Sequence, residues 1–306
     1  MEQQLDHAAV RAAAARTAGA VRPVAVAPAA EGLWYALEYL QHTGSFKARG
    51  AHNFLAAHRE AGSLPAAGVT IASGGNAGLA CAWAARAQGV PATVFLPATA
   101  PRVKVDRLRG YGADVHLVGE GYGEALEACH RFAADSGALA SHAYDHPLIA
   151  AGAGTLVDEI RAALPAVDTV VVAVGGGGLF AGVATAARAH GIRVVAAEPE
   201  NCRALNAALE AGRPVDVPVD SVAADSLGAP RVSADALAAV QRDNAVSVLV
   251  PDEAITAARR ALWEEHRIVV ETGAAAALAA VRTAPRPLGE RVAVVLCGAN
   301  TDPGDL

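Results

Sequence analysis

The sequence is poor in aromatic residues, which make up 4% of its 306 positions although 53% of the residues are hydrophobic. Alanine, valine and leucine supply most of this apolar content, and small side chains of this kind let helices pack closely against sheets. The chain is long enough to bury a core without cross-links. We therefore expect an α/β protein with one large domain or two smaller ones.

Blocks of basic residues are also missing. The 25 basic and 31 acidic residues are mixed along the chain and give a net charge of -6, so nucleic acid is not an expected partner. The four cysteines show neither CxxC pairs nor the spacing of a secreted disulfide framework, which predicts reduced thiols in a reducing, cytoplasmic compartment. They are Cys81, Cys129, Cys202 and Cys297.

No segment is suited to export or to a membrane. Asp6 and Arg11 interrupt the alanine-rich N-terminal stretch, so it lacks the apolar core of a signal peptide. The uncharged segment 169–187 contains four consecutive glycines, which would disrupt a membrane helix. We expect no membrane partner.

From residue 68 onward, β-branched runs alternate with alanine-rich stretches of helical length, and Gly89, Gly137 and Gly191 stand where helices would end. The predicted strands are 69–72, 92–97, 114–119, 168–174, 193–199, 246–251 and 291–297. This βαβ order predicts open, twisted, mainly parallel sheets flanked by helices.

The strands form two series, and the stretch HPLIAAGAG lies where one series gives way to the other. We predict a large domain from residues 1–67 and 147–306, and a small mobile domain from residues 68–146. In such sheets ligands bind beyond the carboxyl ends of the strands.

Lysine is nearly absent, because only Lys47 and Lys104 occur among the 25 basic residues. Arginine serves wherever positive charge alone is needed, but it cannot form a Schiff base, whereas a desolvated lysine amine can. Lys47 in HTGSFKARG is therefore a candidate for covalent chemistry. The alternative, a surface lysine beside Arg49 on a helix face, explains this residue equally well when it is taken alone.

Two glycine-rich turns join a strand to a helix. Ser73-Gly74-Gly75-Asn76 would direct backbone N–H groups and a helix dipole at an anion such as a carboxylate, although an ordinary tight turn would also explain the glycines. Gly175–Gly178 would wrap a phosphate. The same loop also fits a dinucleotide fingerprint with Glu198 about 20 residues further on, which favours an oxidoreductase.

The strand VAVVLCGAN delivers Cys297 to the sheet edge, and taken alone this residue is better explained as a simple core thiol. Taken together, however, TGSFKARG, SGGNAG, GGGGL, ETGAAAALAA and CGAN follow one another in an order that resembles the fold-type II, tryptophan synthase β-like, pyridoxal-phosphate enzymes. Within them the chain resembles the serine/threonine dehydratase branch, from about residue 20 onward. A nicotinamide oxidoreductase has no use for Lys47 or Cys297, so the resemblance disfavours it.

The resemblance implies a role for each matching residue. Lys47 would carry pyridoxal 5'-phosphate as a Schiff base and take the substrate Cα proton, and Phe46 would lie against the ring. Asn76 would bond the ring's 3′ oxygen. The cofactor phosphate would be held by Gly175, Gly176, Gly177, Gly178 and Leu179. The substrate carboxylate would be held by Ser73, Gly74, Gly75, Asn76 and Ala77. Gly228 and Glu271 match positions near the cofactor, although Glu271 also suits the first turn of a helix.

Cys297 matches the position that contacts the pyridine nitrogen. A neutral thiol there makes the ring a weaker electron sink than an Asp would, which favours departure of a β-hydroxyl over a long-lived carbanion. The resemblance thus implies a lyase that converts L-serine, L-threonine or a related β-hydroxy amino acid to a 2-oxo acid and ammonia. Which hydroxy amino acid is preferred stays open.

Two departures from the family pattern narrow this expectation. Related serine racemases carry a serine where this chain has Gly74, so a racemase or a β-replacement enzyme of the same fold is the alternative. A catalytically silent cofactor-binding protein is another. Glu198 matches a cation-site glutamate, but its partner position is Ala204, so a divalent ion is not expected and a monovalent cation stays open. The ten histidines lack metal-site spacing. The resemblance also implies a homodimer. Feedback inhibition by isoleucine is not expected.

Overall fold

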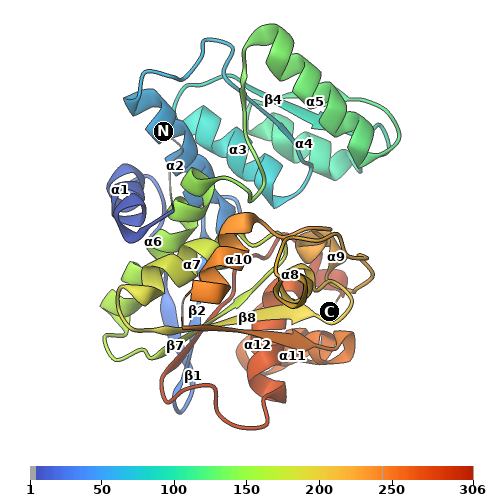
Figure 1. Cartoon of the computed structure of the whole chain (residues 1–306). Helices are drawn as coiled ribbons and strands as arrows, with labels where there is room; N and C mark the ends of the chain where they lie inside the picture. The colour runs from blue at the N-terminus through green and yellow to red at the C-terminus, as the bar shows by residue number, and fades with distance from the viewer. Residues whose placement is uncertain (1–4, 243, 306) are drawn as a thin grey trace.

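The computed structural model describes residues 5–242 and 244–305, which are arranged around two β-sheets (Figure 1). Residues 69–140 supply the strands of the smaller sheet, and the segments before and after them supply the larger one. We call the smaller sheet with its helices the small lobe, and the larger sheet with its helices the large lobe.

The larger sheet has the strand order β1-β2-β10-β7-β8-β9. Its strands are β1 (Val26–Ala30), β2 (Leu33–Ala36), β7 (Thr169–Ala173), β8 (Arg193–Pro199), β9 (Ala245–Val250) and β10 (Val292–Val295). All neighbours run parallel except β1 and β2, which form an antiparallel hairpin. The carboxyl ends of β10, β7 and β8 therefore meet at one edge, where loops can converge on a ligand.

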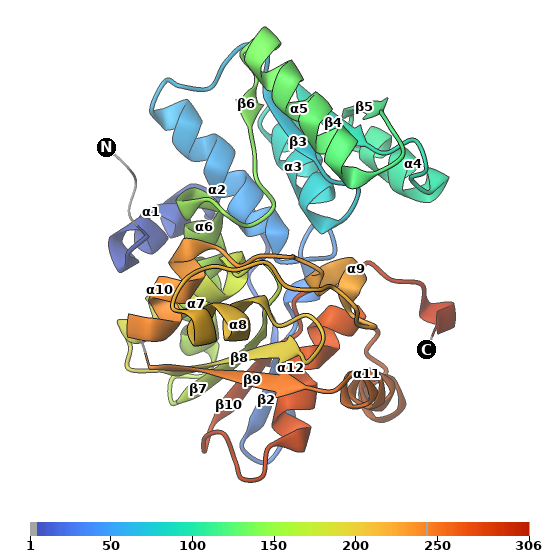
Figure 2. The same ribbon diagram turned by 45° about the vertical axis from the view of Figure 1, so that its right-hand side comes forward.

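Helices cover both faces of this sheet (Figure 2). On one face lie α6 (Pro147–Ala163), α7 (Gly178–Arg188), α1 (His7–Thr17), α8 (Ala204–Ala211) and α10 (Ala234–Arg242). On the other face α12 (Thr272–Thr283) packs on the strands and α11 (Asp252–His266) packs on α12. Every residue of α12 from Gly273 to Ala280 is buried, which small side chains make possible by letting the helix approach the sheet closely.

The small lobe is built on a parallel sheet with the order β5-β4-β3-β6. Its strands are β3 (Val69–Ala72), β4 (Ala92–Leu96), β5 (Asp114–Leu117) and β6 (Leu139–Ala140). Its helices are α3 (Asn76–Ala87) and α4 (Arg102–Gly110) on one face and α5 (Tyr122–Ser136) on the other. Helix α2 (Lys47–Glu60) packs on both α3 and α6 and so joins the two lobes.

The sequence-based α/β fold is confirmed, because each predicted strand segment contains a strand and helices flank both sheets. The hairpin β1–β2 and the two-residue β6 were not predicted, and the hairpin makes the larger sheet mixed. The strand VAPAA carries Pro28 and only one β-branched residue, so its composition gives little strand signal. Gly32, with φ +70°, makes the tight turn between the two strands.

All four cysteines are buried and free, as their spacing predicted. None of the helices in the described part of the chain combines the length and the apolar composition needed for a membrane crossing.

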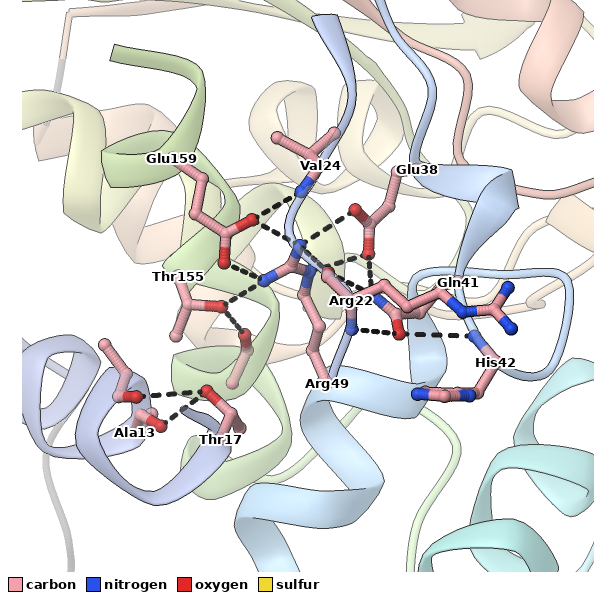
Figure 3. A network of polar contacts seen from close by, with 12 residues as sticks. Ala13, Thr17, Arg22, Val24, Glu38, Gln41, His42, Arg49, Thr155 and Glu159 are labelled. Atoms are coloured by element: carbon pink, nitrogen blue, oxygen red, sulfur yellow. Dashed lines mark hydrogen bonds and ion pairs between the residues drawn. The ribbon is translucent and has the colours of Figure 1, made fainter. Parts of the chain in front are cut away.

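A buried arginine fixes the start of α2 (Figure 3). The guanidinium of Arg49 donates to both carboxylate oxygens of Glu38, at 2.6 and 3.0 Å, and to both of Glu159, at 2.7 Å each. It also donates to the hydroxyl of Thr155. Burial alone would lower the pKa of Arg49, but the two carboxylates raise it above its ordinary value. Arg49 is thus fully buried, not on the exposed helix face that the surface alternative required.

Candidate active site

A cavity of about 740 Å³ lies between the two lobes, at the carboxyl ends of β3, β7 and β10. Its wall contains every residue that the sequence singled out, with the exception of Glu198. These are Phe46, Lys47, Ser73, Gly74, Gly75, Asn76, Ala77, Gly175, Gly176, Gly177, Gly178, Leu179, Gly228, Glu271 and Cys297. Segments more than 200 residues apart in the chain therefore meet at one place, which is the position expected for a ligand in open α/β sheets.

Lys47 is the first residue of α2, and its side chain extends into the cavity. Its Nζ donates to the carbonyl of Ala143 at 3.2 Å and lies 4.7 Å from the centroid of the Phe46 ring. Desolvation lowers the pKa of Lys47, against opposing contributions from Cys297 and Glu271. A larger fraction of the amine is therefore neutral than in an exposed lysine, and a neutral amine can attack a carbonyl.

Backbone pairing brings Cys297 next to Lys47. The N–H of Phe46 donates to the carbonyl of Cys297 at 2.9 Å, and Ser45 forms an antiparallel bridge with Gly298. Burial, followed by the charge of Glu271, raises the pKa of the Cys297 thiol to about 12. The thiol is consequently neutral at the pH of a cell, and presents no anion to a group in the cavity.

The glycine loop requires glycine at several positions. Gly177 has φ +92°, a conformation that L side chains rarely adopt. A Cβ on Gly176 would lie 2.4 Å from the ring of Tyr144, and one on Gly178 would lie 2.7 Å from the carbonyl oxygen of Tyr144. The loop leads directly into α7, whose first N–H groups have no carbonyl within the helix to bond. This geometry makes the loop an anion site at a helix N-terminus.

The loop that follows β3 has a similar arrangement at the start of α3. A Cβ on Gly74 would lie 2.7 Å from the end of the Leu96 side chain, so a larger residue here would have to displace that flexible side chain. The hydroxyl of Ser73 accepts a hydrogen bond from the N–H of Gly75 at 3.4 Å. The free N–H groups at the start of α3 provide a second anion site in the same cavity.

Asn76 has partners that the sequence did not reveal. Its Nδ2 donates to both carboxylate oxygens of Glu271, at 2.9 and 3.0 Å, and its Oδ1 accepts from Asn300 Nδ2 at 2.6 Å. The backbone N–H of Asn300 donates to the same carboxylate at 2.8 Å. Burial raises the pKa of Glu271, while its bonds to Asn76 and Asn300 lower it. The predicted bond from Asn76 to a cofactor stays a prediction, because both ends of its amide already have partners.

Several residues of the cavity were missed in the sequence. Tyr144 covers the glycine loop and donates to the carbonyl of Arg231 at 3.1 Å, and His142 lies in the same segment of the wall. Lys104 and Asp225 form an ion pair of 3.1 Å at the wall between α4 and α9 (Ala224–Leu227). The HAYDH stretch that contains Tyr144 has neither a glycine pattern nor a strand end to mark it, so only the fold could reveal it.

Glu198 lies outside the cavity and is fully buried. Its carboxylate accepts the N–H groups of Leu205 at 2.7 Å and Asn206 at 2.9 Å, and the hydroxyl of Ser247 at 3.4 Å. Burial raises its pKa to about 7, although these hydrogen bonds lower it. Glu198 therefore caps the start of α8 and does not face the glycine loop, as a dinucleotide site would require.

Comparison with known proteins places the chain in a family. The family model described as "Pyridoxal-phosphate dependent enzyme" matches residues 9–298. The chain belongs to this family.

Two curated relatives and one solved structure are similar to it. The L-threonine ammonia-lyase of Geobacter sulfurreducens is 38% identical over 88% of this chain and 67% of its own length. The serine dehydratase-like protein of Mus musculus is 39% identical over 80% of this chain and 74% of its own length. Maize serine racemase superposes with a TM-score of 0.92 at 28% identity, over 99% of this chain and 96% of the other. The fold is that of the fold-type II enzymes.

The cavity fits pyridoxal phosphate. A lysine amine and a glycine-rich anion site share one wall, which matches the aldehyde and the phosphate of the cofactor. The hydroxyl of Ser226, on the same wall, is buried and has no hydrogen-bond partner among the described residues, which leaves a polar group for a ligand to bond. Lys47, Phe46, the loop Gly175–Leu179 and Cys297 line the cavity and are the residues that would hold it.

Proposed function

We propose that the chain is a pyridoxal-phosphate-dependent ammonia-lyase, which converts L-serine, L-threonine or a related β-hydroxy amino acid to a 2-oxo acid and ammonia by α,β-elimination. The main support is that the Lys47 amine, the glycine loop and the neutral Cys297 thiol share one cavity. Relatives named as a threonine ammonia-lyase and a serine dehydratase-like protein support the same reaction class.

Bound pyridoxal phosphate supplies an aldehyde for a lysine amine and an electron-withdrawing ring. In this proposal Lys47 would hold the aldehyde, and its amine, with a pKa lowered by burial, would accept the Cα proton after the amino group of the substrate has taken its place. The N–H groups of Gly175–Leu179 would bind the phosphate, and Phe46 would pack against the ring. Gly228, Asn76 and Glu271, which line the same cavity, would lie near the cofactor.

The substrate carboxylate is assigned to the Ser73–Ala77 loop, where the start of α3 directs N–H groups into the cavity. Gly74 has no side chain, so this position offers no hydroxyl to return a proton to the opposite face of Cα. Cys297 is neutral and does not hold a proton on the ring nitrogen. Both features favour elimination over racemisation, and a racemase or β-replacement enzyme is the second candidate.

Further proposals concern the whole protein. We infer that residues 68–146 form a small mobile domain, and that residues 1–67 and 147–306 form the cofactor-binding one. The two sheets have separate hydrophobic clusters, which supports two domains, although the cluster around the smaller sheet also includes Phe54, Leu55, Leu148 and Ile149 from the flanking segments. A cytoplasmic homodimer is proposed from the reduced cysteines and the family. Because the carboxylate of Glu198 is already occupied by backbone N–H groups, any monovalent cation would be bound mainly by carbonyl oxygens.

The scarcity of lysine makes the covalent proposal directly testable. The protein is incubated with pyridoxal phosphate, reduced with borohydride and digested, and the labelled peptide is identified by mass spectrometry. We expect the label on Lys47, with Lys104 as the control inside the same chain. Replacement of Lys47 by Ala should lower the rate of 2-oxo acid formation from L-serine and L-threonine by roughly 10³-fold or more.

Two results would contradict the proposal. A label found only on Lys104, or an unchanged rate in the Lys47→Ala variant, would remove Lys47 from the chemistry. If D-serine forms from L-serine faster than pyruvate does, the proposed function becomes that of a racemase and not of a lyase. Both products are measured in the same reaction mixture, so the two activities are compared at equal enzyme concentration.

A further inference from the structure

Folding brings together three potential metal ligands that lie far apart in the sequence. His7 is the first residue of α1, Asp158 lies on α6, and His190 follows the end of α7. One donor atom from each lies within 4.8 Å of the other two, and all three side chains are half-buried. Spacing along the chain cannot reveal this cluster, because its members come from three separate segments.

The contacts within the cluster leave one nitrogen unsatisfied. His190 Nε2 lies 2.6 Å from Asp158 Oδ1, so these two residues form a hydrogen-bonded pair. The ring of His7 meets the ring of His190 edge to face, with the centroids 5.5 Å apart. His7 Nε2 is buried and has no hydrogen-bond partner among the residues that the structure describes. A simple ion pair explains Asp158 and His190 but leaves His7 with a buried polar atom, which is unfavourable.

We propose that His7, Asp158 and His190 bind a divalent transition metal, with Zn²⁺ as the preferred ion. Two imidazole nitrogens and one carboxylate oxygen are a common zinc ligand set, whereas Ca²⁺ and Mg²⁺ prefer oxygen ligands alone. Tetrahedral zinc places its donors about 3.3 Å apart, so the cluster needs only small side-chain movements to enclose the ion. Water completes the fourth position, and the ion satisfies the unpaired nitrogen of His7.

The close packing of the three helices holds the ligands in place. A Cβ on Gly154 of α6 would lie 2.6 Å from the carbonyl oxygen of Gly182 on α7 and 3.0 Å from Val10 of α1. The backbones of α6 and α7 are therefore in near contact, with α1 beside them (Figure 1). His7 and Asp158 lie on these helices, which position metal ligands better than loops do, and His190 lies in the turn that directly follows α7.

The metal site is separate from the active site. Helix α7 is 11 residues long, or roughly 16 Å, and carries the glycine loop at its start and the metal cluster just beyond its end. None of the three ligands lines the cavity. The ion therefore has a structural role, in which it ties the N-terminal helix α1 to α6 and α7, and the inference does not depend on the proposed reaction.

The test uses the protein loaded with pyridoxal phosphate and freed of metal by a chelator, followed by calorimetric titration with ZnCl₂. The variants are His7→Gln, Asp158→Asn and His190→Gln, and the exposed His130→Gln is the matched control. We expect one zinc per chain, and a loss of affinity of at least about tenfold in each ligand variant but none in the control. Co²⁺ in place of Zn²⁺ should give the visible absorption of a tetrahedral site.

A second readout is thermal. Zinc should raise the melting temperature of the wild-type protein and of His130→Gln, but not that of His190→Gln. Absence of zinc binding to the wild-type protein would overturn the site, as would wild-type affinity in two or more of the three ligand variants. Asp158→Asn preserves the size of a side chain inside a helix, so the test stands even where His7→Gln loosens α1.

Discussion

Arg49 links Lys47 to the interior of the large lobe. Lys47 and Arg49 are separated by one residue in α2. The guanidinium of Arg49 is bound on both sides, by the carboxylates of Glu38 and Glu159. The first turn of α2 is thereby fixed to η1 (Glu38–Leu40) and to α6. The direction in which Lys47 enters the cavity follows from this anchor.

Replacement of Arg49 by Lys keeps the charge but loses the planar fork that binds two carboxylates at once. We expect the free energy of unfolding to fall by about 3 kcal/mol, because two buried or half-buried carboxylates lose donors. Denaturant unfolding measures the change, with the exposed Arg11→Lys on α1 as the control. A change in Arg49→Lys no larger than that in Arg11→Lys would show that the network adds little to stability.

Single residues also show the limits of sequence analysis. The covalent role of Lys47 stays a prediction, made because lysine is scarce in this sequence and Arg cannot form a Schiff base; the structure places the residue in the cavity wall. Arg49 was not, because nothing in KARG distinguishes a buried arginine from an exposed one. Asn300 was visible in CGAN, but its bonds to Asn76 and Glu271 depend on the meeting of three distant segments.

At the scale of elements, helix α7 has a glycine next to each of its ends, and the two glycines have different surroundings. Its start at Gly177 is closed by Ala236, whose Cβ would lie 2.5 Å from a Cβ on the glycine, while the turn at Gly191 beyond its end faces open space. Both glycines have positive φ, at +92° and +67°. They therefore share the conformational cost of a substitution but differ in what surrounds them.

This pair provides a matched test of the glycine loop. Gly177→Ala and Gly191→Ala should each lower stability by about 1 kcal/mol or more, because alanine is strained at positive φ. Only Gly177→Ala should also weaken the binding of pyridoxal phosphate, by about tenfold or more, since its methyl group displaces the loop. Fluorescence titration with the cofactor measures the affinity. Equal cofactor affinity in the two variants would remove the loop from the binding site.

Sequence patterns predicted those elements whose own amino-acid composition favours their secondary structure. Strands such as β7 and β8 are buried on both faces and consist mainly of valine and alanine, which gives a continuous apolar run. The hairpin β1–β2 and the short β6 depend on neighbouring strands for their pairing, so their sequences carry little independent signal. Tertiary contact, not propensity, determines them.

At the scale of the whole molecule, α4 reaches from the small lobe to the large one. Lys104 pairs with Asp225, and Arg107, one turn further along α4, donates to Asn300. Arg102 on the same helix pairs instead with Asp106 of α4 itself. Two side-chain contacts of α4 thus join the small lobe to the large one, and the contact of Arg102 stays within the helix.

We expect the Lys104–Asp225 pair to hold the lobes together over the bound substrate. Exposed ion pairs contribute up to about 1 kcal/mol, so Lys104→Gln or Asp225→Asn should raise KM by up to about fivefold with little change in kcat. The double variant should raise KM no more than either single variant does, because all three variants lose the same ion pair. Arg102→Gln is the control. Additive effects would instead indicate that each residue contacts the substrate by itself.

The close packing of α12 limits how this enzyme can evolve. Alanines along its buried length lie against β7 and β8, and β7 leads into the glycine loop. An added methyl group on that helix would push on the strands that support the glycine loop. We therefore expect new substrate preferences to arise from substitutions in the small lobe and in exposed segments such as that around Asp225. Helix α12 is expected to stay under purifying selection.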